Sequence, residues 1–206
     1  MIDSAKAAAN RAAREERKKA YLRGMMNRYA ELFRATGNED APSVAREAHA
    51  EIDALLDRDR AKSPNGGDIQ CRKGCSHCCH GPVEIWPHEA KLLIGAARAS
   101  SIEMDRARLE RQSQRTLDDW RQQPWADTAC VFLGDDGACR VYESRPNACR
   151  KLLVTSDPEL CDARRHPPER VERWFSWEAE ILETAAQEVF GGGLMPRLLL
   201  TALKEG

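Results

Sequence analysis

Eight cysteines are the residues of this chain whose type and spacing point most clearly to chemistry. Four of them form the run Cys71-Arg-Lys-Gly-Cys75-Ser-His-Cys78-Cys79. The others follow at Cys130, Cys139, Cys149 and Cys161. Thiolate is a soft ligand that zinc, copper(I) and iron–sulfur centres prefer, and short intervals let one loop fold several sulfurs around a common point. The spacing therefore predicts a metal centre with these cysteines as ligands.

The adjacent pair Cys78-Cys79 argues against a single simple site. Neighbouring residues of an extended chain project to opposite sides, so both sulfurs could not comfortably bind one tetrahedral ion. One would ligate the main centre, and the other would serve a second metal, bridge a polynuclear cluster or stay a free redox thiol. Eight thiols also suit two four-ligand sites, or include one or two buried apolar cysteines, Cys161 foremost. The excess of thiols favours an iron–sulfur cluster, with zinc as the alternative.

Histidines and arginines beside the cysteines could complete the centre. His77 and His80 are reserve ligands, because imidazole can replace a thiolate on zinc or iron. Arg145 and Arg150 flank Cys149, where they could hydrogen-bond to sulfur and offset the negative charge of a bound cofactor. They could instead hold an anionic substrate, or be surface residues of a helical turn that begins at Pro146.

Composition narrows the class of protein. The chain has 206 residues, 42% hydrophobic and 32% charged, which is typical of a folded, water-soluble protein. The formal net charge of -1 predicts no nucleic acid partner, and no stretch approaches the roughly 20 apolar residues of a membrane span. The N-terminus lacks the apolar run of a secretory signal, so we expect a cytoplasmic protein. In that reducing compartment clustered thiols more often hold metal than form disulfides.

Helical patterns flank the cysteine segments. Apolar residues at helical spacing predict a long helix over 5–36 and a second one from Pro42, which together form an N-terminal helical hairpin. The turn-rich run Ser63-Pro64-Asn65-Gly66-Gly67 then divides the chain. We expect an N-terminal helical extension over 1–64 and a cysteine-cluster metal-binding domain over 65–206.

Beyond this linker the sequence predicts helices from Pro87, over 103–121 and from Val171 to a stop at Gly191. The only clear sheet signal is a β-hairpin over 131–142, with turn chemistry at its centre. The predicted fold class is therefore mainly α. It is a small helical domain with an irregular Cys-rich metal-binding core and one short β-hairpin, plus the N-terminal helical hairpin.

Several of these features resemble a known family. They are the run from Cys71 to Cys79, the helix start Pro87-His88-Glu89-Ala90, the stretch from Cys130 to Tyr142, and Arg145-Pro146-x2-Cys149-Arg150. Together they are similar to the YkgJ-like cysteine-cluster family, a zinc- or iron-chelating domain with the signature C-x3-C-x2-C-C. The resemblance covers the middle of the chain and not the N-terminal hairpin. It implies metal binding at the matching cysteines and names no reaction.

Three functions stay open on the sequence. The first is a metal-binding protein with a redox-active or structural iron–sulfur or zinc centre, whose helical surface engages a protein partner. The second is an iron–sulfur-dependent modifying enzyme, methyltransferase-like, which would need an open position on the metal. The third is a structural zinc module that holds a helical adaptor together. The sequence leaves the oligomeric state open.

Overall fold

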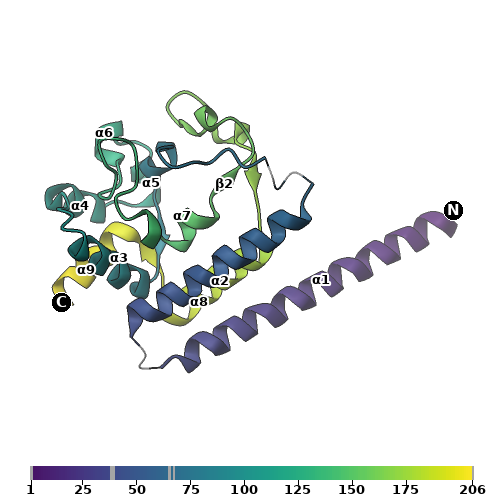
Figure 1. The fold of residues 1–206 in the computed structure, drawn as a ribbon. Coiled ribbons are helices and arrows are strands. Elements are labelled where there is room, and N and C mark those ends of the chain that lie inside the picture. The colour runs from purple at the N-terminus through teal and green to yellow at the C-terminus, as the bar shows by residue number, and fades with distance from the viewer. Residues whose placement is uncertain (1, 38–39, 65, 67, 206) are drawn as a thin grey trace.

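The computed structural model describes residues 2–37, 40–64, 66 and 68–205 and is mainly helical (Figure 1). Its α-helices are α1 (Ile2–Ala35), α2 (Ala41–Lys62), α3 (Pro87–Ala99), α4 (Arg106–Ser113), α5 (Leu117–Trp120), α6 (Trp125–Thr128), α7 (Asn147–Lys151), α8 (Trp177–Phe190) and α9 (Met195–Glu205). Short 3₁₀ helices are η1 (His77–His80), η2 (Tyr142–Ser144), η3 (Pro158–Cys161) and η4 (Pro168–Arg170). In the predicted linker, Asn65 and Gly67 lie outside the described residues. No helix in the described part of the chain combines the length and the apolar content that crossing a bilayer requires.

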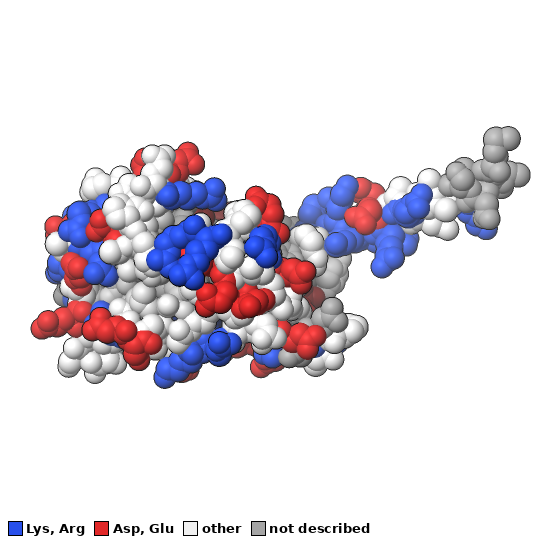
Figure 2. Space-filling model, turned by 90° about the horizontal axis from the view of Figure 1, so that it is seen from above, with Lys and Arg blue, Asp and Glu red and all other residues white. Residues whose placement is uncertain are grey.

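The predicted N-terminal helical hairpin is present as α1 and α2. α2 begins at Ala41 because Asp40 caps it, with its carboxylate accepting the N–H of Ser43 at 3.1 Å, and because Pro42 suits a first turn. The C-terminal half of α1 lies along α8. Residues 6–20 of α1 are exposed throughout and project beyond the body as an arm (Figures 1 and 2).

Two hydrophobic cores hold the helices together. The first lies between α1, α2, α3 and α8, with Ile52 and Trp86 fully buried in it. The second is formed by α3, α4, α9 and the stretch after Cys130, and buries Leu93, Phe132 and Leu199. Because α3 contributes to both cores, the N-terminal helices pack directly on the rest of the chain. The division at about residue 64 stays a prediction.

Among the residues that the structure describes, strand pairing is confined to short antiparallel ladders and one isolated bridge. β1 (Glu84–Ile85) pairs with β4 (Gly193–Leu194), and β2 (Leu153–Val154) pairs with β3 (Arg173–Trp174). The predicted hairpin over 131–142 is reduced to one bridge, between Leu133 and Cys139, around the expected turn. Each ladder joins residues that are far apart in sequence and spans only two residues of each strand, so no local pattern marks it.

Two helices differ from the sequence expectation. The helix predicted over 103–121 is broken between α4 and α5, because Thr116 starts a new helix there. Its hydroxyl accepts the N–H of Asp119 at 3.2 Å, and the Asp119 carboxylate accepts the N–H of Thr116 at 3.0 Å. The late helix begins at Trp177 rather than at Val171, because the preceding residues pair in β3 and Ser176 caps α8.

Candidate metal centre

The two cysteine-bearing stretches lie against each other. The N–H of Cys130 donates to the carbonyl oxygen of Cys79 at 2.8 Å. Gly137 has a φ of +75° and approaches the first stretch so closely that a Cβ there would lie 3.2 Å from the carbonyl oxygen of Gly74. Glycine is the residue that tolerates both the positive φ and the close approach. The turn around Gly137 is therefore docked on the 71–79 loop.

A separate contact ties Cys71 to the segment that follows α7. The N–H of Val154, in β2, donates to the sulfur of Cys71 at 3.3 Å. The carbonyl oxygen of Val154 accepts the N–H of Gln70 at 2.9 Å. Cys149 lies in α7, just before β2. These bonds therefore place the start of the 71–79 loop next to the segment that carries Cys149.

One set of thiols combines the first cysteines of the chain with the last one, Cys161. The pKa of Cys161 is raised to about 11, mainly by burial and then by the thiols of Cys75, Cys71 and Cys78, because a second negative charge nearby opposes ionisation. Burial likewise raises the pKa of Cys71, with contributions from Cys78 and Cys75. Cys161, named above both as a ligand and as the foremost candidate for a buried apolar cysteine, is partly exposed and lies within electrostatic range of three other thiols.

A second set comprises Cys130, Cys139 and Cys149. Burial raises the pKa of Cys149 well above its usual value, and the next contributions come from the thiols of Cys130, Cys78 and Cys139. Burial also raises the pKa of Cys130 to about 12. Cys78 raises the pKa of members of both sets and therefore lies within electrostatic range of both.

The adjacent pair does not have the extended backbone assumed from the sequence. Cys78 and Cys79 lie in η1, whose helical turn places neighbouring side chains closer together than an extended strand does. A hydrogen bond with the Cys79 thiol is the main cause of the raised pKa of Cys78. The expectation that the two sulfurs point to opposite sides is therefore wrong, and both can serve one region.

Three thiols are oriented by the same local turn. In each case the backbone N–H two residues further along donates to the cysteine sulfur: His77 to Cys75, Phe132 to Cys130, and Val141 to Cys139. Each bond acts against burial and lowers the pKa of its thiol, because the N–H dipole stabilises the thiolate. Hydrogen bonds of this kind stabilise metal-bound thiolates and tune the metal.

The sulfurs are gathered but not closed around one point. Among residues 2–37, 40–64, 66 and 68–205, no group of three or more His, Cys, Asp or Glu side chains is arranged so that it could hold a metal ion as it stands. What the structure provides is proximity of the thiols and orientation of several sulfurs by N–H donors.

Comparison with known families identifies the segment that carries these thiols. Residues 70–169 match the CxxCxxCC family model, whose description is "Putative zinc- or iron-chelating domain". This segment belongs to that family. The CxxCxxCC domain makes up just under half of the chain and contains all eight cysteines. Neither the comparison with curated proteins nor that with solved structures gives a match.

The residues of the CxxCxxCC domain fit a thiolate-bound metal. All eight cysteines lie in the described part of the chain and are free thiols. Because neighbouring thiols raise one another's pKa, several of them can be anionic together only beside positive charge, which a metal ion supplies. Zinc and iron–sulfur centres both take such ligands.

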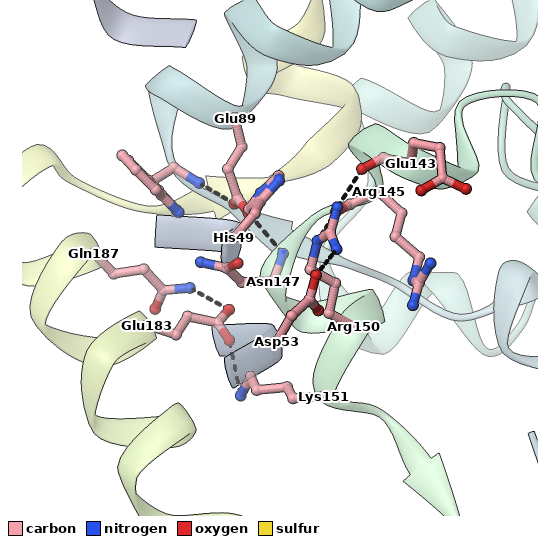
Figure 3. Close-up of polar contacts among 11 residues, drawn as sticks. His49, Asp53, Glu89, Glu143, Arg145, Asn147, Arg150, Lys151, Glu183 and Gln187 are labelled. Carbon is pink, nitrogen blue, oxygen red and sulfur yellow. Dashed lines mark hydrogen bonds and ion pairs between the residues drawn. The ribbon is translucent and has the colours of Figure 1, made fainter. Parts of the chain in front are cut away.

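The two arginines that flank Cys149 have different surroundings. The Arg145 guanidinium lies 3.9 Å from the centre of the Tyr142 ring and lowers the pKa of both Cys78 and Cys139. Arg150 is buried, pairs with Asp53 of α2 and donates to the carbonyl oxygen of Arg145 at 2.9 Å (Figure 3). Arg145 thus acts on the thiols, whereas Arg150 anchors the loop that carries Arg145.

Both histidines of the first run contact other residues of the domain. The Nδ1 atom of His80 lies 3.0 Å from the carbonyl oxygen of Trp125, and the two rings stack at 3.7 Å. Burial lowers the pKa of His80, which favours its neutral form. His77 lies 3.7 Å from the Glu159 carboxylate. Their role as reserve ligands stays a prediction.

A buried carboxylate that contacts α7, the helix of Cys149, was not predicted from the sequence. Glu89 in α3 is fully buried, and its oxygens accept the N–H of Asn147 at 2.7 Å and that of Trp86 at 3.3 Å (Figure 3). His49 of α2 is buried too and lies 3.0 Å from the same carboxylate. Glu89 therefore joins α2, α3 and α7, and α7 carries Cys149. The available signal was the position of Glu89 in the first turn after Pro87, where a carboxylate caps a helix.

A second buried charge lies next to this network. Glu183 of α8 is buried and lies 2.8 Å from the ammonium of Lys151, which also pairs with Glu180 (Figure 3). Burial raises the pKa of Glu183 to about 7, in spite of the neighbouring ammonium. Lys151 thereby fastens the end of α7 to α8.

Proposed function

We propose that this chain holds an iron–sulfur centre through thiolates of its CxxCxxCC domain. One ligand set is Cys71, Cys75 and Cys161, and the other is Cys130, Cys139 and Cys149. Cys78 and Cys79 complete the two sets, which form either two sites or one shared polynuclear site. Such a centre supplies one-electron redox chemistry, with a potential that depends on hydrogen bonds to the sulfurs.

The gathering of thiols around Cys78 carries this proposal. One closed zinc site uses four ligands, so a second set of thiols in the same region is more than one zinc ion needs. The backbone donors to Cys75, Cys130 and Cys139 support it as well, because hydrogen bonds to sulfur stabilise an iron–sulfur centre that carries net negative charge. Arg145 adds a positive charge beside Cys78.

The deciding experiment is purification of the full chain without oxygen, followed by visible absorption and by analysis of iron, zinc and acid-labile sulfide. We expect a brown protein that contains iron and sulfide. A colourless protein with stoichiometric zinc would replace this proposal by a structural zinc centre, for which four thiolates are also suitable ligands. A protein without either metal would contradict both.

Cysteine variants distinguish one shared centre from two. Replacing the first set by serine should remove about half of the iron if there are two sites, and nearly all of it if the centre is shared. The second set should behave in the same way. Lys73→Ser, an exposed change within the 71–79 loop, is the matched control and should keep full metal content. Unchanged metal in both cysteine variants would show that the ligands lie elsewhere.

A further inference from the structure

An aromatic groove lies where α1 packs against the start of α8, and no cysteine lines it. Among the described residues five large apolar side chains are exposed, and three of them line or border this groove: Tyr21, Phe175 and Trp177. Phe175 and Trp177 pack edge to face with ring centroids 4.8 Å apart. The groove has a volume of about 440 Å³. These rings form an aromatic platform in which each ring remains about half exposed.

The groove presents positive charge to a ligand. Its two carboxylates, Asp59 and Glu178, are both engaged by Arg58, at 2.8 and 2.5 Å. The ammonium of Lys18 lies 4.6 Å from the centre of the Trp177 ring, and Lys62 also lines the groove. The acidic groups are thus occupied by the protein's own guanidinium, whereas the two lysines remain available to an anion.

The arm of α1 continues this positive charge away from the groove. Arg11, Arg14, Lys18 and Tyr21 follow one another at intervals of three and four residues, so they share one face of the helix. Arg17 lies four residues before Tyr21 and joins the same face. Figure 2 shows that Lys and Arg side chains gather on the arm where it leaves the body. The basic face therefore leads directly into the aromatic platform.

We propose that the basic face of α1 and the aromatic platform together bind single-stranded nucleic acid. Cations at regular spacing suit a chain of phosphates, and exposed rings beside them suit unpaired bases, which stack without regard to sequence. The near-neutral net charge of the whole chain gave no such indication, because the acidic residues that balance it lie mostly elsewhere.

Other polyanions fit these surfaces less well. The bases of a duplex are already stacked and cannot lie on Phe175 or Trp177. A membrane would need apolar residues that insert among lipids, and the apolar residues over 6–20 are all alanine. An acidic protein would match the charge but would leave the stacking rings unused. The combination of charge and exposed rings thus favours unpaired nucleotides.

Binding can be measured on the full chain by fluorescence anisotropy, with labelled thymidine and uridine oligonucleotides of about 16 nucleotides. Arg14→Gln/Arg17→Gln should weaken binding and reduce the slope of log K against log salt by about 1.4, which corresponds to about 0.7 for each lost phosphate contact. Phe175→Ala and Trp177→Ala, made singly, should each weaken binding by about tenfold and leave the slope unchanged.

The matched control is Lys19→Gln/Arg23→Gln, which removes the same charge from the opposite face. Both residues are exposed and lie two positions from Tyr21, and two residues turn a helix by about 200°. We expect this variant to bind almost as well as the original chain. Equal losses in the two double variants, or an absence of salt-dependent binding to both oligonucleotides, would overturn the proposal. The proposal would also be overturned if the Arg14/Arg17, Phe175 and Trp177 variants lost binding to anionic lipid vesicles or to polyglutamate and kept binding to the oligonucleotides.

Discussion

Replacing Glu89 by alanine should destabilise the fold and release the metal together. The carboxylate is fully buried and contacts the imidazole of His49 and the backbone N–H groups of Trp86 and Asn147. Removing it leaves these three groups in the interior without that partner. Because Asn147 is two residues before Cys149, the loss also loosens the turn that carries a proposed ligand.

The cost can be estimated from the bonds that are lost. A buried donor left without a partner costs about 1 to 3 kcal/mol, and two such donors together cost about twice as much. The bond from Trp86 is long, at 3.3 Å, so we count mainly the contacts to His49 and Asn147. We therefore expect Glu89→Ala to lower the free energy of unfolding by about 3 to 5 kcal/mol.

Urea denaturation of the metal-loaded chain, followed by circular dichroism, measures this change. Glu89→Gln keeps the volume of the side chain and one oxygen acceptor, so it should lower the free energy of unfolding by less, about 1 to 2 kcal/mol. Glu47→Ala in α2, at an exposed position, is the control and should stay within about 0.5 kcal/mol of the original chain. A loss below about 1 kcal/mol in Glu89→Ala would refute the account of Glu89 as the residue that joins three helices.

Three further predictions concern pH, backbone and metal. Burial raises the pKa of Glu183 from 4.5 to about 7, so the folded chain holds an extra proton between these pH values and its free energy of unfolding falls as the pH rises through them. Glu183→Gln should flatten that decline by up to about 1.4 kcal/mol per pH unit. The control Glu188→Gln, at an exposed position, should leave the decline unchanged. Equal pH profiles for the original chain and both variants would show that Glu183 does not cause it. Gly137→Ala should lower the free energy of unfolding by about 1 to 3 kcal/mol and reduce the metal content, because Gly137 has a positive φ and lies close to Gly74. The control Gly95→Ala, at an open position in a helix, should raise the free energy of unfolding slightly. A chelator should lower the melting temperature and added metal should restore it, and a melting temperature that does not respond would show that the metal does not support the fold.

The sequence predicted most of the helices because their signals are local. Pro42 predicted the start of α2 to within one residue, and Pro87 predicted the start of α3 at the residue where the structure begins it. The break before α5 also had a signal, since Thr116 and Asp119 form a capping box. Apolar periodicity continued across that break and concealed it.

Contacts between distant residues could not be predicted in the same way. Glu89 and His49 are both ordinary polar residues of helices in the sequence, and their burial depends on how α2 packs against α3. The aromatic platform is formed by Tyr21 together with Phe175 and Trp177, which the chain brings together only in three dimensions. The spacing of the cysteines indicated the type of chemistry, but not which thiols would be neighbours.

The organisation of the cysteines explains how a loop-rich segment can place so many thiols. The turns at Cys75, Cys130 and Cys139 are local, since each sulfur accepts an N–H from two residues further along. A local turn orients its own sulfur and cannot set its distance from the others. That distance depends on long-range bonds, such as those from Cys130 to Cys79 and from Asn147 to Glu89. These bonds are made by backbone groups and a buried carboxylate, so contacts of the fold that involve no sulfur position the segments that carry the two thiol sets.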